Sequence, residues 1–286
     1  MFTTFLLLFS NIAWAYVDPA CAEIADTNGD GMPGPAPQGY SEEAQQNYLL
    51  NFFSAGTTFS PLHAPVPSPA GTGSFGVELS IIPPLGCEKR LVLDYTKTED
   101  TNKMPVLPRP RISFAFPAID TENHKIIPYA GLGYVPPIKV QGMQNVVMSV
   151  EAGIGIKDKE EKGLQYGLRG HATLLKTVAE IATPFEEGGE TYPDFYVGST
   201  MGANVMLGYS NEGITPYIAL GFLDVSTFFY IDDDGIVINN GNPYSGPEAA
   251  IGTQWRPNKK IQVAGEFYTV PSVIYTGRFR VSYLFN

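Results

Sequence analysis

Cysteine, histidine and tryptophan are scarce in this chain: its 286 residues include two Cys, three His and two Trp. The two cysteines form no CxxC motif and have no histidine at zinc-site spacing, so their pattern supports neither a metal site nor a dithiol redox site. In an exported chain an isolated pair of cysteines is more often bridged than free. We therefore predict a disulfide between Cys21 and Cys87.

Charged residues are also few, and most of them are acidic. They make up 16% of the chain, with 18 Lys and Arg against 29 Asp and Glu, whereas hydrophobic residues make up 44%. The net charge of −11 argues against nucleic acid as a partner, because phosphates need basic contacts. The composition is too apolar for a disordered chain. Beyond the first residues, no stretch approaches the ~18 to 20 consecutive apolar residues of a membrane-spanning helix.

Residues 1–15 have the pattern of an export signal. An apolar run, Phe5 to Phe9, is followed by Ala13-Trp14-Ala15, a small-x-small motif typical of a signal-peptidase site. The usual basic start is missing, and a buried first strand is the alternative interpretation. We predict that residues 1–15 are a signal peptide and that the mature chain is exported.

The C-terminal segment alternates between two kinds of side chain. Tyr275 and Phe279 fall on one side and Arg278 and Arg280 on the other, which predicts a strand with one apolar and one polar face. From residue 72 onward about ten segments share this pattern, each ~9 to 13 residues long, enough to cross a bilayer as a tilted strand.

One segment departs from the alternation, because residues 214–230 are apolar on both sides. We predict a bulge there, near Asp224.

The connections between these segments alternate in length, as they do in membrane barrels with short turns on one side and long loops on the other. Two links, 139–144 and 270–273, are short where long ones are expected. The short turns are 119–125, 157–163, 210–213 and 257–260, and the long loops are 84–108, 178–194 and 231–243. We predict an all-β fold, a transmembrane antiparallel up-and-down β-barrel of about ten strands (8 to 12) over residues 72–286. A soluble secreted β-sandwich is the alternative.

The chain resembles bacterial outer-membrane β-barrel proteins in its leader, in its amphipathic strands and in the aromatic alternation of its last strand, Arg280 to Phe285. The resemblance covers about three quarters of the chain. It implies an outer-membrane location, contact with outer-membrane lipid, and insertion by the barrel-insertion machinery, which usually recognises a terminal aromatic residue. Here Asn286 follows Phe285, so the aromatic lies one position early.

An N-terminal extension, residues 16–71, precedes the strands. It is rich in Pro and Gly and holds one predicted short helix, at about 41–54, with an apolar stripe at Tyr48, Leu49, Phe52 and Phe53. The helix should therefore dock on another part of the protein, either inside the barrel as a plug or at its inner mouth. In this respect the chain loosely resembles the plugged long-chain fatty-acid transporters, which have more strands.

Ten charged or titratable residues are predicted to face the barrel interior as a polar network. A barrel of about ten strands is narrow, so these charges must pair. A salt-bridged core and a selective polar pore or ligand pocket are the two interpretations. The residues are Glu78, Arg111, Glu151, Arg169, His171, Glu248, Arg256, Glu266, Arg278 and Arg280.

A calcium-loop pattern occurs in the extension. Asp26, Asn28 and Asp30 alternate as oxygen ligands, but Pro37 stands where such a loop has its bidentate Glu. Calcium binding and an Asx-rich turn are the two interpretations.

The function that this sequence favours is not enzymatic: passage of small or apolar solutes, including lipids, or a structural role in the envelope. The alternative is a barrel-based hydrolase that uses His171, although no Ser or Asp stands at motif spacing from it.

Overall fold

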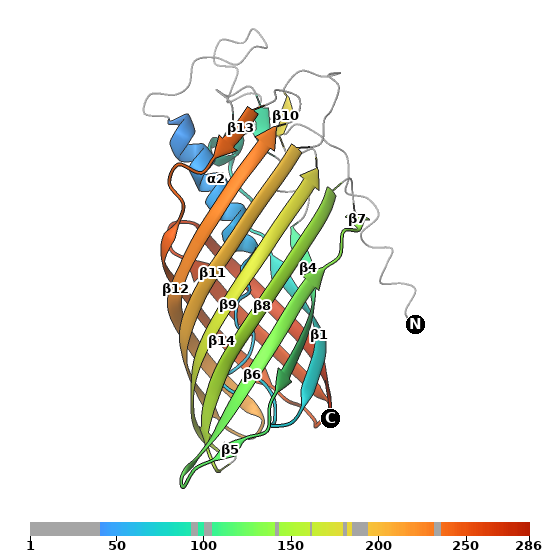
Figure 1. The fold of residues 1–286 in the computed structure, drawn as a ribbon, viewed down its shortest axis with the longest axis vertical. Coiled ribbons are helices and arrows are strands. Elements are labelled where there is room, and N and C mark those ends of the chain that lie inside the picture. Colours follow the sequence, from blue (N-terminus) through green and yellow to red (C-terminus); the bar gives the residue numbers. More distant parts are fainter. Residues whose placement is uncertain are drawn as a thin grey trace.

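Ten antiparallel strands close into a barrel, which confirms the predicted fold class (Figure 1). The computed structural model describes residues 41–92, 97–99, 105–140, 143–160, 162–179, 182–184, 194–231 and 236–286. Each barrel strand pairs with the next, and the last pairs with the first, from Gly73 opposite Phe285 to Ser80 opposite Arg278. The barrel strands are β1 (Gly73–Ile81), β4 (Val106–Ala115), β6 (His124–Val135), β8 (Met143–Asp158), β9 (Gly163–Ala179), β11 (Asp194–Ser210), β12 (Ile214–Ile231), β14 (Ser245–Trp255), β15 (Ile261–Val270) and β16 (Ile274–Phe285).

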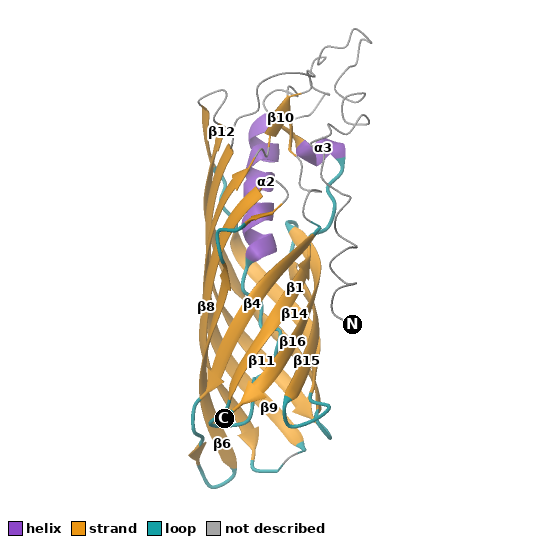
Figure 2. Cartoon of the chain, turned by 90° about the vertical axis from the view of Figure 1, so that its right-hand side faces the viewer, coloured by secondary structure: helices purple, strands orange, loops and turns teal. Residues whose placement is uncertain are grey.

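The two ends of the barrel differ, and we call them the short-turn end and the long-loop end. At the short-turn end, β11 and β12 are joined through Glu212 and Gly213, whose φ angles of 50° and 82° give the positive pair of a tight hairpin turn. The remaining short elements are β5 (Ile119–Asp120) at this end and, around the long-loop end, α3 (Cys87–Arg90), β2 (Leu91–Val92), β3 (Lys97–Glu99), β7 (Lys139–Val140), β10 (Ala182–Pro184) and β13 (Ile236–Asn239) (Figures 1 and 2).

Helix α2 (Glu42–Thr57) enters the barrel at the long-loop end and runs down inside it (Figure 2). Its N-cap is Ser41, whose hydroxyl accepts the amide N–H of Ala44 at 3.3 Å. The predicted helix, 41–54, was therefore about one turn short. Of the two positions that we predicted for this helix, the lumen is the observed one.

Residues 58–72, which we call the lumen segment, continue from α2 through the lumen to β1 at the short-turn end (Figure 2). From Thr58 to Ser68 every side chain is buried. The segment has no regular structure, as its prolines predicted. We refer to Ser41, α2 and the lumen segment together as the plug, residues 41–72.

Inward-facing glycines make room for the plug. A Cβ at Gly133 would lie 2.8 Å from the Phe59 ring, one at Gly167 3.2 Å from Pro65 Cβ, and one at Gly208 2.9 Å from Pro65 Cδ. The poor alternation of β6 thus has a steric reason, since side chains on this part of the wall would occupy the path of the lumen segment.

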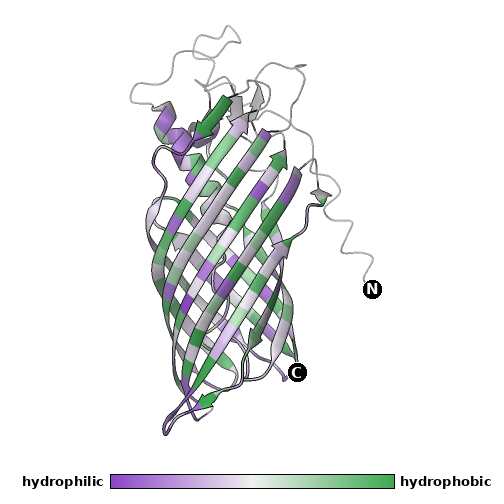
Figure 3. Ribbon diagram, in the orientation of Figure 1, coloured by the Kyte–Doolittle hydropathy of each residue, from purple (hydrophilic) through white to green (hydrophobic). Residues whose placement is uncertain are grey.

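The exterior of the barrel is apolar, and hydropathy alternates along each strand (Figure 3). Large hydrophobic side chains stand exposed around the wall; Met201 and Val205, for example, are 68% and 67% exposed. A continuous apolar surface of this kind needs lipid against it. Among the described residues, no helix is long and apolar enough to cross a membrane.

Strand β12 is regular, so the bulge predicted near Asp224 was wrong. Its pairing with β11 runs without a slip through Met201 opposite Asp224. The strand is apolar on both sides because its inward residues Leu223 and Val225 pack in the same core cluster as Phe52 of α2. The plug, and not a backbone irregularity, explains the pattern.

We expect Gly155→Ala to destabilise the barrel, because the new Cβ would lie 2.9 Å from Val66 Cγ2 and against the carbonyl of Pro65. Overpacking of this kind costs roughly 1–3 kcal/mol. The measurement is the urea midpoint of unfolding in lipid vesicles. Gly170→Ala is the matched control, since its Cβ would face outward, 4.0 Å from the carbonyl oxygen of Gly202. Equal midpoints for the two variants would contradict a tightly fitted plug.

Candidate functional site

The lumen contains a belt of buried ion pairs centred on two glutamates. Glu78 of β1 binds Arg109 at 2.6 Å and Arg111 at 2.9 Å, both from β4, and its Oε1 lies 3.8 Å from Arg278 of β16. These side chains are at most 1% exposed. One carboxylate therefore lies among three guanidinium groups. They come together because β1 pairs with β4 on one side and with β16 on the other.

The second glutamate extends the belt across the lumen. Glu151 of β8 binds Arg111 at 3.2 Å and Arg169 of β9 at 2.6 Å, and its Oε2 lies 3.5 Å from Nε2 of His63 in the plug. Arg169 also donates to Asn204 at 2.8 Å. We call Arg109, Arg111, Arg169 and Arg278 the arginine cluster.

Glu248 continues the network on β14. Its Oε1 accepts Asn204 Nδ2 at 2.6 Å and lies 2.7 Å from His171 Nε2, and its Oε2 accepts the Tyr268 hydroxyl at 2.6 Å. Among the described residues no hydroxyl hydrogen-bonds to the His171 ring. The hydrogen bond to Glu248 makes His171 a member of the lumen network.

The arginine cluster binds the backbone carbonyls of the plug. Arg278 donates to the carbonyls of Ala55 at 3.4 Å and Gly56 at 3.2 Å, and also to that of Thr58. Arg109 donates to Thr57 at 2.8 Å and to Thr58 at 3.2 Å. These are the carbonyls at the C-terminus of α2, where the helix leaves acceptors unsatisfied and carries its partial negative charge.

The same pattern continues into the lumen segment. Arg169 donates to the carbonyl of Phe59, and Arg111 donates to those of Ser60 at 3.1 Å and Pro61 at 3.2 Å. Seven consecutive carbonyls, from residue 55 to residue 61, are therefore hydrogen-bonded to four wall arginines. These bonds satisfy backbone groups that have no partner in a helix or sheet.

Further along the plug, wall side chains accept the backbone N–H groups. Glu266 accepts that of Leu62 at 2.9 Å, Gln254 that of Ala64 at 3.0 Å, and Gln165 that of Val66 at 3.3 Å. The wall thus supplies cations opposite the carbonyls and neutral or anionic oxygens opposite the N–H groups.

Phe59 joins this polar arrangement through its ring. The ring centroid lies 3.7 Å from Arg111 Cζ, 5.0 Å from Arg109 Cζ and 5.7 Å from Arg169 Cζ, and the side chain is fully buried. A desolvated guanidinium over an aromatic face contributes about 2 kcal/mol. Phe59 is therefore the apolar contact that fixes the plug among the arginines.

Arg280 stands opposite Glu78 in the pairing of β16 with β1, but its guanidinium is hydrogen-bonded to hydroxyl groups. Its guanidinium donates to Ser282 at 2.7 Å, Ser74 at 2.9 Å and Ser113 at 3.3 Å, and Nη1 has no hydrogen-bond partner. It forms no ion pair with any carboxylate in the described part of the chain. Arg280 is nevertheless buried, with 1% of its surface exposed.

The predicted network residues are buried inside the barrel with one exception. Arg256 follows the end of β14 and is only half-buried, and no ion pair to a described carboxylate joins it to the belt. Sequence reasoning missed Arg109, although it stands two residues before Arg111 and so shares its face. The prolines on either side of Arg109 concealed the start of that strand.

Several predicted features lie outside the described residues: the signal peptide, Cys21, and the calcium pattern at Asp26, Asn28 and Asp30. The disulfide therefore stays a prediction. Within the residues that the structure describes, no group of three or more His, Cys, Asp or Glu could hold a metal.

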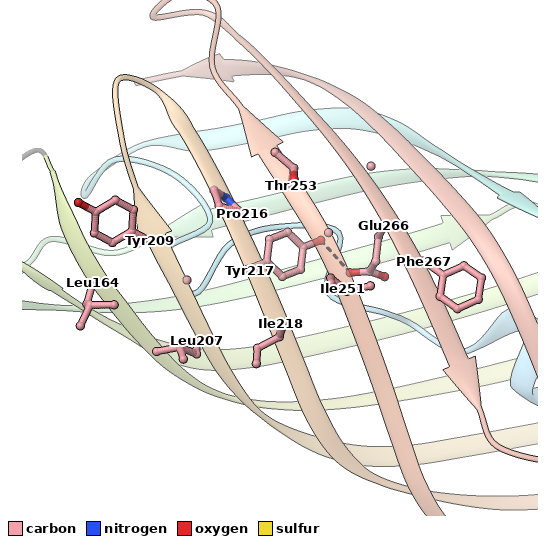
Figure 4. Close-up of a pocket in the computed structure, with 13 residues that line it drawn as sticks. Leu164, Leu207, Tyr209, Pro216, Tyr217, Ile218, Ile251, Thr253, Glu266 and Phe267 are labelled. Carbon is pink, nitrogen blue, oxygen red and sulfur yellow. Dashed lines mark hydrogen bonds between the residues drawn. The ribbon is translucent and has the colours of Figure 1, made fainter.

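Hollows also occur outside this belt. A groove of about 590 Å³ on the outer wall is lined by Leu207, Ile218 and Ile251, with the hydrogen-bonded pair of Tyr217 and Glu266 behind it (Figure 4). A second hollow, of about 380 Å³, lies beside α2 at the long-loop end. The groove on the outer wall faces lipid, because most of the side chains that line it belong to the exposed apolar surface.

No family model matches this chain, and no curated protein matches it. Similar solved structures include the attachment invasion locus protein Ail of Yersinia pestis in complex with sucrose octasulfate (12% identity, 76% of this chain, 99% of that chain, TM-score 0.33). Others are the beta domain of the Bordetella autotransporter BrkA (9% identity, 75% and 98%, TM-score 0.42) and the Pseudomonas putida toluene transporter TodX (12% identity, 79% and 70%, TM-score 0.32). Likenesses this distant carry no argument about function.

The fold and its surface define the class of this protein. A closed antiparallel barrel with an even number of strands, an apolar exterior and a polar interior is a transmembrane β-barrel of the outer membrane. More particularly, it is a barrel whose own N-terminal segment lies in its lumen and is bound there by arginines.

We expect Glu151→Gln to lower the free energy of unfolding by roughly 3–5 kcal/mol, because Arg169 would lose its ion-pair partner among the described residues and Arg111 would keep only Glu78. The measurement is urea unfolding in lipid vesicles, followed by the loss of heat-modifiable migration. Glu122→Gln, on an exposed turn, removes the same charge outside the lumen and should leave the midpoint unchanged. A similar midpoint for both variants would show that the buried pairs add nothing to stability.

Proposed function

We propose that this protein is a plugged transport barrel, closed at rest, which conducts solutes when residues 41–72 shift within the lumen. The observation that supports this most directly is the path of the plug, which enters at the long-loop end and leaves at the short-turn end (Figure 2). The occupied path supports a closed resting state over an open passive pore.

The kind of contact that holds the plug favours movement. Arg109, Arg111 and Arg278 bind backbone carbonyls, and water can take the place of those carbonyls as the acceptor when the lumen is hydrated. An apolar filling of the same volume would often be at least as stable as buried ion pairs. Buried ion pairs therefore add little stability to a barrel that has only a structural role. In a barrel whose plug must move, they leave a polar lumen wall that water can solvate.

The lumen segment also contains backbone strain. Leu62 has a φ of 48°, in the left-handed region that a branched side chain rarely adopts. This conformation costs of the order of 1–3 kcal/mol and is held by the bond from its N–H to Glu266. Release of the segment would relieve that cost, which lowers the energy difference between the plugged and unplugged states.

The most direct test is conductance in planar lipid bilayers. We expect the wild-type protein to be closed most of the time and Phe59→Ala to give discrete current steps, because the variant loses the ring that lies among Arg109, Arg111 and Arg169. Phe75→Ala removes an equal side chain from the lipid-facing surface, where Phe75 is exposed, and should stay as closed as the wild type.

A cross-link separates movement of the plug from a leaking wall. A Cβ at Gly198 of β11 would touch the Ser54 hydroxyl of α2, so cysteines at these two positions can bridge the helix to the wall. In a Cys21→Ala/Cys87→Ala background, oxidation of Ser54→Cys/Gly198→Cys should abolish the Phe59→Ala current, and reduction should restore it. Silence of folded Phe59→Ala would instead support a sealed structural barrel.

A further inference from the structure

We infer that the passage selects small oxyanions, compounds that carry a phosphate, sulfate or carboxylate group. This inference rests on the proposed transport function and names its substrate class. It is drawn from the chemistry of the wall that the plug covers.

The arginine cluster carries more positive charge than its glutamates neutralise. Four guanidinium groups pair with only two carboxylates, those of Glu78 and Glu151. Arg109 also donates to Ser149 and Arg169 to Asn204, and most of the other donors are directed at the carbonyl oxygens of residues 55–61. When the plug shifts, these donors lose their acceptors, and only water or an anion can replace them.

The geometry of two arginines suits an oxyanion in particular. Arg111 directs Nη1 to the carbonyl of Ser60 and Nη2 to that of Pro61, and Arg109 divides its two terminal nitrogens between Thr57 and Thr58 in the same way. A guanidinium with both nitrogens on two neighbouring oxygens is the arrangement with which arginine binds phosphate and carboxylate groups. The plug carbonyls thus stand where the oxygens of an anion would bind.

Arg280 supplies a second position for an anion, two residues closer to the short-turn end on β16 than Arg278. Its counterparts are the hydroxyls of Ser74, Ser113 and Ser282, and its Nη1 is directed at no protein acceptor. A buried guanidinium among hydroxyls, with no carboxylate in contact, has both the charge and the spare donors that an oxyanion requires.

Two other glutamates face the lumen, on β14 and β15. Glu248 is hydrogen-bonded to His171, Asn204 and Tyr268, and Glu266 to Tyr217 and the N–H of Leu62. Asn204 links Glu248 to Arg169, but neither glutamate forms an ion pair with a described arginine, so the guanidinium groups of the cluster are neutralised by Glu78 and Glu151 alone. Selectivity in a pore follows such rings of charged side chains.

The test is the reversal potential of the Phe59→Ala channel in a potassium chloride gradient. We expect a reversal potential whose sign shows that anions are more permeant than cations. Arg280→Gln in the same channel should lower that ratio, whereas Lys259→Gln, an exposed residue in a turn at the same end, should not. Potassium phosphate, added at constant ionic strength, should reduce the chloride current several-fold, because phosphate binds the arginines longer than chloride does.

The outcomes separate the two proposals. Absence of current in folded Phe59→Ala overturns the transport function itself. A current with no anion preference, or one that phosphate leaves unchanged, overturns the substrate class and leaves the transport function standing. If Arg280→Gln does not fold, the reversal potential and the phosphate titration of Phe59→Ala still decide the question.

Discussion

The bonds between four buried guanidinium groups and the carbonyls of residues 55–61 are the interaction on which the rest of this structure depends. A chain that leaves a helix inside a narrow barrel exposes carbonyls that neither helix nor sheet can satisfy. Arg109, Arg111, Arg169 and Arg278 satisfy them, and Glu78 and Glu151 make those arginines tolerable in a buried site. Fold, plug and polar network therefore form one unit.

The presence of the plug explains features of the barrel wall that an empty lumen would not require. Gly133, Gly167 and Gly208 leave the space through which Phe59 and Pro65 pass. Leu223 on β12 is apolar toward the lumen because Phe52 of α2 lies in the same core cluster. In each case the inward side of a strand is shaped by the plug, while its outward side is shaped by lipid.

A lumen filled with paired charges differs physically from one filled with apolar side chains. Its contacts can be replaced by water, so the filled and the hydrated lumen are closer in free energy than an apolar core would allow. In the proposed transport mechanism, the wall that binds the carbonyls of Ser60 and Pro61 through Arg111 would bind anions once those carbonyls are withdrawn. Closure and selectivity can thus come from one set of side chains.

The alternation of side chains along the strands by itself indicated a barrel of about ten strands, between 8 and 12, and the inward positions of Glu78, Glu151 and Arg169, because a pleated strand assigns neighbouring residues to opposite faces. Only the tertiary structure decided that α2 lies in the lumen, that Arg109 belongs to the network and that β12 is regular. Those outcomes depend on contacts between residues far apart in the chain, such as Phe59 with Arg111. The hydrophobic periodicity of a segment does not indicate which side chains it will contact across a lumen.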